Sequence, residues 1–127
     1  MDTHEKETTI RQYIAAYNRF DVEEMAGMLH ADIVFTNLSK GEVSHQTRGI
    51  AAFTELANQS KDIFSYRRQT PVQFKTLEDK TVVTIEFKGI LAGDLPNEAS
   101  QGDEIKLSGS SEFEFEGNKI IRIRDVS

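Results

Sequence analysis

The sequence contains no cysteine, which excludes disulfides, thiolate nucleophiles and cysteine-held metal or iron–sulfur centres. It also lacks any apolar stretch near the roughly 18 to 20 residues that span a bilayer, so we expect no membrane contact. The first residues, Met-Asp-Thr-His-Glu-Lys-Glu, lack the basic flank and apolar run of a secretory signal, and we therefore expect a cytoplasmic location. Basic residues number 15 against 21 acidic ones, and the net charge of −6 disfavours nucleic acid as a partner.

Standard catalytic and cofactor signatures are missing as well. His4, His30 and His45 are isolated from one another, without the spacing that brings two ligands to one metal ion, so we expect no metal site. No Gly-x-Gly-x-x-Gly or Walker sequence is present, and no cofactor is expected. The segment 107–111, Leu-Ser-Gly-Ser-Ser, differs from a Gly-x-Ser-x-Gly nucleophile elbow and alternates as a strand does.

The chain is nevertheless suited to form a folded domain. Its 127 residues suffice for a single domain with a buried core, and they are too few for two ordinary ones. Hydrophobic residues make up 38% of the chain and charged residues 28%, as in a globular protein. We find no internal repeat, low-complexity tract or linker, and we predict one domain over residues 1–127.

Helical spacing of apolar residues appears three times before residue 65. The first helical face has i, i+3, i+4, i+7 spacing and comprises Ile10, Tyr13, Ile14 and Tyr17. It predicts a helix over about residues 4–19, with Asp2 and Glu5 as its capping box. A second, short helix begins after Asp21, and its buried stripe comprises Met25, Met28 and Leu29. A third helix begins at Ile50 and fades between residues 59 and 65.

The remaining segments alternate with a period of two. They predict strands over 32–38, 43–48, 66–77, 81–91, 105–115 and 119–126. Tight turns at 40–42, 78–80 and 116–118 make the flanking strands antiparallel hairpins. The connection from Gly93 to Asp103 is longer and polar, and we expect it to be mobile. The fold class is therefore α+β, in the order α-α-β-β-α-β-β-β-β, with helices on one face of a bent antiparallel sheet.

Polar groups on apolar faces mark a candidate ligand pocket. Tyr13 and Tyr17 lie one helical turn apart, so both hydroxyls can project over one apolar space, although core tyrosines would have the same spacing. Asn37 and Ser111 alternate in phase with apolar residues, and a buried polar group needs a hydrogen-bond partner or a ligand. The candidate ligand-binding residues are Tyr13, Tyr17, Ile33, Phe35, Asn37, Ser111 and Phe113.

Basic residues cluster weakly in the second half of the chain. Arg67 and Arg68 are adjacent, and Lys119, Arg122 and Arg124 follow near the end. They would form either a small basic patch or a solvated sheet face, and the alternation of strands favours the solvated face.

Three segments resemble the nuclear transport factor 2-like superfamily. They are Ile10-Arg-Gln-Tyr-Ile-Ala-Ala-Tyr-Asn-Arg-Phe-Asp-Val-Glu-Glu-Met, Leu29-His-Ala-Asp-Ile-Val-Phe and Arg48-Gly-Ile-Ala-Ala-Phe. The terminal stretch Phe113-Glu-Phe-Glu-Gly-Asn-Lys-Ile-Ile-Arg-Ile-Arg is similar to the last hairpin of the ketosteroid isomerase-like and SnoaL-like polyketide cyclase branches. The resemblance covers nearly the whole chain. It implies a cone-shaped sheet wrapped around helices, an apolar pocket, and a homodimer formed through the outer sheet face.

The resemblance also assigns positions for chemistry. Tyr13 falls where ketosteroid isomerases place the tyrosine that donates to the developing oxyanion, and it is the best catalytic candidate. The isomerase base falls at Asn37, which cannot accept a proton from a carbon acid, and the second oxyanion donor falls at Ser111. These two replacements argue against standard ketosteroid isomerisation. SnoaL-like cyclases use an acidic residue on a late strand, for which Asp125 is the nearby candidate, although a surface aspartate is the favoured interpretation.

Two functional hypotheses follow. In the first, an apolar pocket binds a small carbonyl- or hydroxyl-bearing molecule, and any reaction would be of isomerase or cyclase-like lyase type, with Tyr13 polarising a carbonyl. A base would then be required, from His45 or Glu86. In the second, the chain is a non-catalytic association module with an incidental pocket. Apolar residues on both faces of the strand 81–91, with Val82 on one face and Ile85 and Phe87 on the other, support dimerisation. A strand buried on both faces would have the same pattern, and Ile85 and Phe87 could equally be core residues. The sequence identifies neither the ligand nor the reaction.

Overall fold

The computed structural model describes residues 1–95 and 99–127, and its helices and strands follow the predicted order. The elements are α1 (Thr3–Asn18), α2 (Val22–Gly27), β1 (Leu29–Ser39), β2 (Glu42–Arg48), α3 (Ile50–Lys61), β3 (Phe64–Thr76), β4 (Thr81–Leu91), β5 (Glu104–Glu116) and β6 (Lys119–Val126). The α+β fold class and the element order are confirmed. The connection 93–103, predicted to be mobile, includes residues 96–98, which lie outside the described residues.

The first two helices begin at the predicted caps. The Asp2 side chain accepts a hydrogen bond from the Glu5 backbone N–H at 2.8 Å, and the Glu5 side chain accepts one from the Asp2 backbone N–H, which completes a capping box. Asp21 caps α2 by accepting from the Glu24 N–H at 3.0 Å. The boundary after α2 differs from the prediction, because Leu29 begins β1 and pairs with Ile120 of β6 instead of extending the helical stripe.

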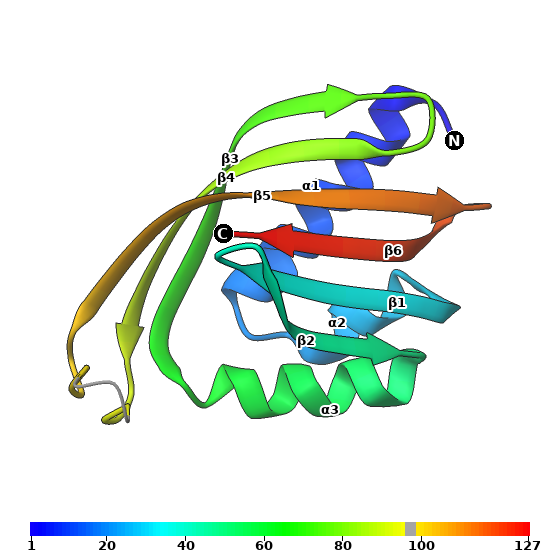
Figure 1. Ribbon diagram of the computed structural model, residues 1–127. Helices are drawn as coiled ribbons and strands as arrows, with labels where there is room; N and C mark the ends of the chain where they lie inside the picture. The colour runs from blue at the N-terminus through cyan, green and yellow to red at the C-terminus, as the bar shows by residue number, and fades with distance from the viewer. Residues whose placement is uncertain (96–98) are drawn as a thin grey trace.

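The six strands form one bent sheet in the order β2-β1-β6-β5-β4-β3. Neighbouring strands are antiparallel except β1 and β6, which pair in parallel near the middle of the sheet. Figure 1 shows β3, β4 and β5 curving away at one end, whereas β1, β2 and β6 run straighter. The sheet is therefore an open cone rather than a closed barrel.

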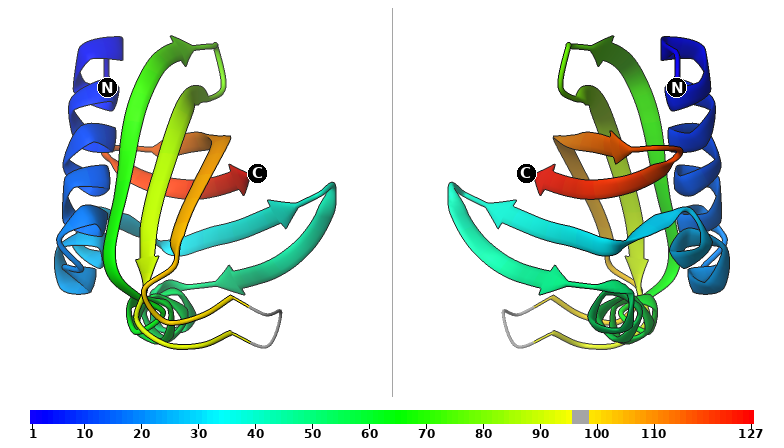
Figure 2. Two further views of the ribbon diagram at one scale, coloured as in Figure 1. Left: turned by 90° about the vertical axis from the view of Figure 1, so that its left-hand side faces the viewer. Right: turned by 90° about the vertical axis from the view of Figure 1, so that its right-hand side faces the viewer.

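The helices cover the concave face of this cone. Figure 2 shows α1 along one side of the sheet and α3 end-on below it. The core between them is aromatic and aliphatic, and its largest fully buried side chains are Phe113, Ile10, Ile33, Leu91, Ile120, Ile123 and Val83. Edge-to-face ring pairs join the helices to the sheet, with 5.8 Å between the Tyr13 and Phe113 centroids and 5.7 Å between those of Phe35 and Phe53.

The convex face carries charges. Lys80 Nζ lies 2.8 Å from a Glu112 carboxylate oxygen, and Lys88 Nζ lies 3.4 Å from one of Glu104. Of the two roles that the sequence leaves open for Ile85 and Phe87, interface or core, the structure supports the core. Ile85 is 5% exposed in the core, and Phe87 is half-buried on the same concave face. Side chains alternate between the two faces of a strand, and Val83 is buried on the concave face. Ile85 and Phe87, two and four residues later, therefore lie on that face as well. In the described part of the chain, no helix is long and apolar enough to span a membrane.

Candidate functional site

A cavity of about 80 Å³ lies between the helices and the concave face of the sheet. Most of its lining is apolar, and a few polar groups converge on it. The lining residues are Tyr13, Tyr17, Met25, Phe35, Phe53, Leu56, Ala57, Ser60, Arg67, Gln69, Ser111, Phe113 and Asp125. A mostly apolar cavity with a few convergent polar groups is the usual form of a small-molecule site.

The C-terminal end of α1 is fixed to β3, and this positions one wall of the cavity. Asn18 bridges the two elements: its Nδ2 donates to the Gln69 carbonyl at 3.0 Å, and its Oδ1 accepts from the Gln69 N–H at 2.7 Å. Arg67 Nε donates to the Tyr17 carbonyl at 2.9 Å. Because β3 is an edge strand, the outward N–H and C=O groups of Gln69 are free to make the two bonds with Asn18.

A bulge in the last hairpin brings Asp125 into the cavity. Phe115 of β5 pairs with Ile120 of β6, but the register shifts by one residue between Phe115 and Glu114. Beyond this shift, Phe113 pairs with Ile123. Each one-residue slip moves side chains to the opposite face of a strand. Asp125 therefore lies on the concave face opposite Ser111, while Arg124 projects outward.

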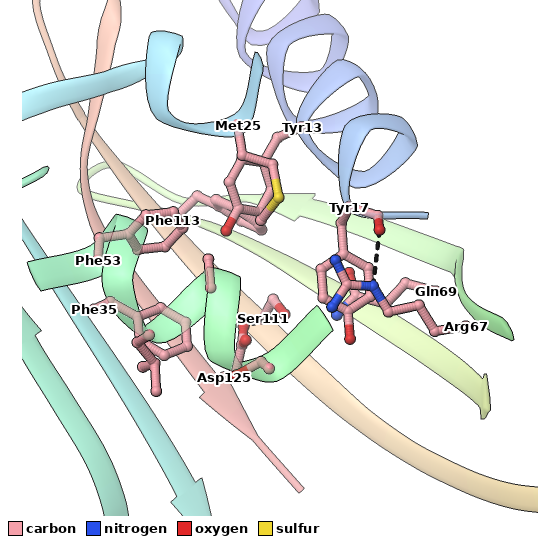
Figure 3. A pocket seen from close by; sticks show the side chains of 13 residues that line it. Tyr13, Tyr17, Met25, Phe35, Phe53, Arg67, Gln69, Ser111, Phe113 and Asp125 are labelled. Carbon is pink, nitrogen blue, oxygen red and sulfur yellow. Dashed lines mark hydrogen bonds between the residues drawn. The ribbon is translucent and has the colours of Figure 1, made fainter. Parts of the chain in front are cut away.

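The Asp125 carboxyl group is held in an enclosed, weakly polar setting. Ser111 Oγ donates to Asp125 Oδ1 at 2.6 Å, and Figure 3 shows these two side chains pointing toward each other. Burial raises the pKa of Asp125 from 3.8 to about 6, and the Ser111 hydrogen bond opposes this rise. The interpretation of Asp125 as a surface aspartate is thus wrong. Near neutral pH this group is a carboxylate with more than the usual basicity of aspartate.

The two tyrosines lie on the α1 side of the cavity. Tyr13 is 5% exposed, and Figure 3 shows its ring extending from α1 toward the cavity between Met25 and Phe113. Burial raises the pKa of Tyr13 well above its ordinary value, and the charge of Asp125 adds to the effect. Burial also raises the pKa of Tyr17, although the nearby Arg67 guanidinium opposes it. Both phenols therefore stay protonated near neutral pH and can donate hydrogen bonds.

Arg67 is buried in the cavity wall, so the solvated-face interpretation is wrong for this residue. Its side chain extends over two aromatic rings, with the guanidinium carbon 3.8 Å from the Tyr17 centroid and 4.5 Å from the Phe20 centroid. Desolvation by burial lowers the pKa of Arg67, but a guanidinium keeps its charge in proteins. Arg68, by contrast, is exposed as predicted.

A second cavity of about 310 Å³ adjoins the first. The two cavities share four lining residues, namely Tyr17, Gln69, Ser111 and Asp125. The second cavity is also lined by aromatic and aliphatic side chains from the curved ends of the strands, among them Phe64, Phe87 and Leu107. Asp125 therefore lies at the junction of an inner and an outer space.

The predicted ligand-binding residues divide into three groups. Five line the inner cavity: Tyr13, Tyr17, Phe35, Ser111 and Phe113. Asn37 lines only the outer one, where its Nδ2 lies 2.7 Å from Ser44 Oγ. Ile33 is fully buried in the core away from both cavities. Ligand binding by these residues remains a prediction.

The bases suggested by the sequence do not reach this site. His45 is exposed on β2 and contacts Ser44, and exposed Glu86 accepts a hydrogen bond from Ser108 at 2.8 Å. Asp125 is the carboxylate of the inner cavity instead. Among the described residues, no cluster of three histidine, aspartate or glutamate side chains could hold a metal ion.

Comparison with known proteins identifies the family. The model described as a SnoaL-like domain matches residues 10–123. The chain belongs to the SnoaL-like domain family. This places it in the SnoaL-like branch of the nuclear transport factor 2-like superfamily, as its sequence resemblance indicates. No curated protein matches the chain in sequence.

Several solved structures share the fold at low sequence identity. A candidate polyketide cyclase from Xanthomonas campestris has 19% identity and a TM-score of 0.82, over 98% of this chain and 90% of that one. AclR, a candidate hydroxylase from Streptomyces galilaeus, has 18% identity and a TM-score of 0.78, over 98% and 90%. TerC, co-crystallised with polyporic acid, has 17% identity and a TM-score of 0.75, over 95% and 89%. These structures confirm the cone-shaped α+β fold, and a shared fold does not by itself assign a reaction.

Proposed function

We propose that this SnoaL-like protein is an enzyme that moves a proton at the carbon next to a carbonyl group of a small, largely apolar molecule. Asp125 is the general base, and it returns the proton as the acid. The observation that carries the proposal is the placement of this carboxyl group, with a pKa of about 6, at the junction of the two cavities. A base works best when its pKa lies near the working pH.

The surrounding groups suit the charge that such a reaction develops. Removal of the proton leaves an enolate oxygen, which protonated phenols stabilise by hydrogen bonding in a site sheltered from water. Tyr13 and Tyr17 line the same cavity and stay protonated because burial raises their pKa values. Ser111 holds Oδ1 of Asp125 by its hydroxyl, so the carboxylate has a fixed orientation.

The base position differs from the one that the isomerase resemblance assigns. That position falls at Asn37 on β1, whereas Asp125 lies on β6 and is the register partner of Asn37 in the parallel pair. The carboxylate therefore comes from the neighbouring strand at the same level of the sheet. This supports proton transfer by a different residue and argues against the standard ketosteroid isomerase arrangement.

Ligand size is consistent with both cavities being used. An enclosed apolar cavity of about 150 Å³ holds a benzene ring, which exceeds the roughly 80 Å³ of the inner space. A ring-sized ligand would extend from the inner cavity past Asp125 into the outer one. TerC, crystallised with polyporic acid, indicates that this fold accommodates small organic molecules.

The test follows deuterium incorporation at the activated carbon of 2-tetralone in heavy water by NMR. Wild type is expected to accelerate incorporation over buffer, and Asp125→Asn is expected to lose about 100-fold or more of that rate. Asp79→Asn, in the exposed β3–β4 turn, is the matched control and should equal wild type. Absence of acceleration by wild type, or full activity of Asp125→Asn, would contradict the proposal.

A further inference from the structure

Arg67 carries a buried donor that the protein leaves without a partner. The residue is 3% exposed, and its Nε donates to the Tyr17 carbonyl at 2.9 Å. Its Nη2 atom is buried and has no hydrogen-bond partner within the described residues. Buried donors in proteins are almost always paired, so an orphaned guanidinium nitrogen in a cavity wall indicates a missing ligand group.

Within residues 1–95 and 99–127, no acidic side chain forms an ion pair with Arg67. The rings of Tyr17 and Phe20 offer cation–π contacts, which offset part of the cost of burial. The other charged group of the inner cavity, Asp125, forms its short hydrogen bond with Ser111 and no ion pair with Arg67. Burying a charge without a counterion is expensive, and such groups are retained where function requires them.

Arg67 and Asp125 line different parts of the two adjoining cavities. Arg67 lines only the inner cavity, whereas Asp125 lines both cavities. A molecule that spans both cavities would therefore contact Asp125 at the junction and Arg67 within the inner cavity. The rest of the inner wall is largely apolar, with Met25, Phe53 and Leu56 among its side chains.

We propose that Arg67 binds a carboxylate of the substrate, so that the substrate is a small, largely apolar carboxylic acid that also carries the carbonyl group of the proposed reaction and is held with its anionic end in the inner cavity. The unpaired Nη2–H donates to a carboxylate oxygen, and the guanidinium charge balances the anion. The inference names the substrate class for the site of the proposed function and rests on that function for the role of Asp125. Anchoring the acid at Arg67 leaves the neighbouring carbon atoms of the molecule beside Asp125.

Benzoate and benzamide are the probes that test this inference. They are planar and nearly equal in shape, and only benzoate carries a charge. Isothermal titration calorimetry at pH 7.5 is expected to give at least tenfold tighter binding of benzoate than of benzamide to wild type. Arg67→Met keeps an apolar side chain over the Tyr17 ring and is expected to lose that preference. Arg67→Lys, which keeps the charge, should restore part of it.

The matched control is Arg68→Met, which removes the same charge from the adjacent, exposed position. It should bind benzoate as wild type does, because its side chain lies on the opposite face of β3. Circular dichroism melting checks the fold of each variant. Arg67→Met removes both the buried charge and the hydrogen bond from Nε to the Tyr17 carbonyl, so a cooperative melting curve is required to show that this variant is folded.

Three outcomes would overturn the inference: no binding of benzoate to wild type, equal binding of benzoate and benzamide, or unchanged benzoate binding by folded Arg67→Met. Asp125→Asn separates this inference from the proposed function, since it should bind benzoate at least as tightly as wild type. If benzoate binding depends on Arg67 but Asp125→Asn keeps full exchange activity, Arg67 is retained as the carboxylate-binding residue and Asp125 is rejected as the general base. If Asp125→Asn loses exchange but benzoate binding does not depend on Arg67, Asp125 is retained as the base and the role of Arg67 is rejected.

Discussion

The Asn18 side chain hydrogen-bonds to both backbone polar groups of Gln69, and so it occupies part of the free edge of β3. The amide thereby joins the end of α1 to the strand that carries Arg67. Neither partner is exposed, so the two bonds are partly shielded from water. This contact fixes the relative position of Tyr17 and Arg67, which come from different elements.

Asn18→Ala is expected to destabilise the protein by about 1 to 3 kcal/mol, because it leaves the Gln69 N–H and C=O groups without partners. Urea denaturation followed by circular dichroism measures the change. Gln12→Ala, which removes an exposed amide from the same helix, is the control and should have little effect. Equal stability of both variants would mean that the Asn18 bridge does not hold α1 on the sheet.

Asp125→Asn is expected to stabilise the protein at high pH. Because folding raises the pKa of Asp125 from 3.8 to about 6, the folded protein binds a proton more tightly than the unfolded chain does. The carboxylate therefore costs stability in full above about pH 6, and the cost vanishes as the pH falls below about 4. Its size at pH 8 is roughly 3 kcal/mol.

Thermal melting of both proteins between pH 4 and pH 8 tests this effect. The variant should melt several degrees above wild type at pH 8, and the two curves should converge near pH 4. A constant difference across the range would show that the substitution acts through packing and not through the titration of Asp125.

Ser111→Ala is expected to raise the pKa of Asp125 further, since the Ser111 hydrogen bond lowers it. The carboxyl carbon of Asp125, followed by NMR as a function of pH, reports the midpoint directly. The exchange of 2-tetralone should shift to higher pH in parallel. Ser110→Ala, on the other face of β5, should leave the midpoint in place, and an unchanged midpoint in Ser111→Ala would contradict the assigned hydrogen bond.

Ala57→Leu is expected to fill the inner cavity. Ala57 lies on α3 and lines this space, so three more carbon atoms at that position occupy volume that a ligand would use. Benzoate binding should fall at least tenfold in calorimetry, while the protein stays folded. Ala51→Leu on the exposed face of the same helix is the control. Retention of binding by Ala57→Leu would place the benzoate site elsewhere.

The homodimer that the resemblance implies stays a prediction, and the outer sheet face is its expected contact surface. Thr84 is exposed on that face of β4 and is suited to test it. Native mass spectrometry is expected to detect a dimer of wild type and a larger monomer fraction of Thr84→Arg, with equal melting temperatures. Gln12→Arg, on α1, should remain dimeric, and a monomeric wild type would reject the prediction.

Periodicity alone predicts most of the fold. The spacing of Ile10, Tyr13 and Ile14 marks α1, and the alternation of apolar and acidic residues in 112–116 marks the buried face of β5. These signals are local, and the core residues that they identify are buried. The family resemblance supplies the bend of the sheet, which no local pattern encodes.

Asp125 is missed because a bulge changes the parity of its strand. A regular hairpin through the turn at 116–118 would put Arg124 opposite Ser111 and leave Asp125 on the outer face. The one-residue shift after the pair of Phe115 with Ile120 reverses this arrangement. The in-phase alternation of Asp125 with buried Ile123 is the one local signal for its position.

Arg67 is missed for a different reason. Its neighbours in the outward phase, Tyr66 and Val72, are apolar, and yet they are 41% and 60% exposed. The alternation of apolar residues in β3 therefore predicts that the face with Tyr66 and Val72 is buried, whereas the structure buries the face with Arg67. On the buried face, the register partner of Arg67 is Gly89, which makes room for the Phe64 ring, because a β-carbon there would lie 2.7 Å from that ring.

The parallel pairing of β1 with β6 has a consequence for how the chain folds. The β1–β2 hairpin joins the rest of the sheet only through β6, the last strand of the fold. During synthesis on the ribosome, this hairpin must wait for β6 before it acquires its neighbour in the sheet. The contact order is correspondingly high, and we expect slow folding with a late, cooperative closing step. Because β6 also carries Asp125, the candidate site is complete only once this strand has joined the sheet.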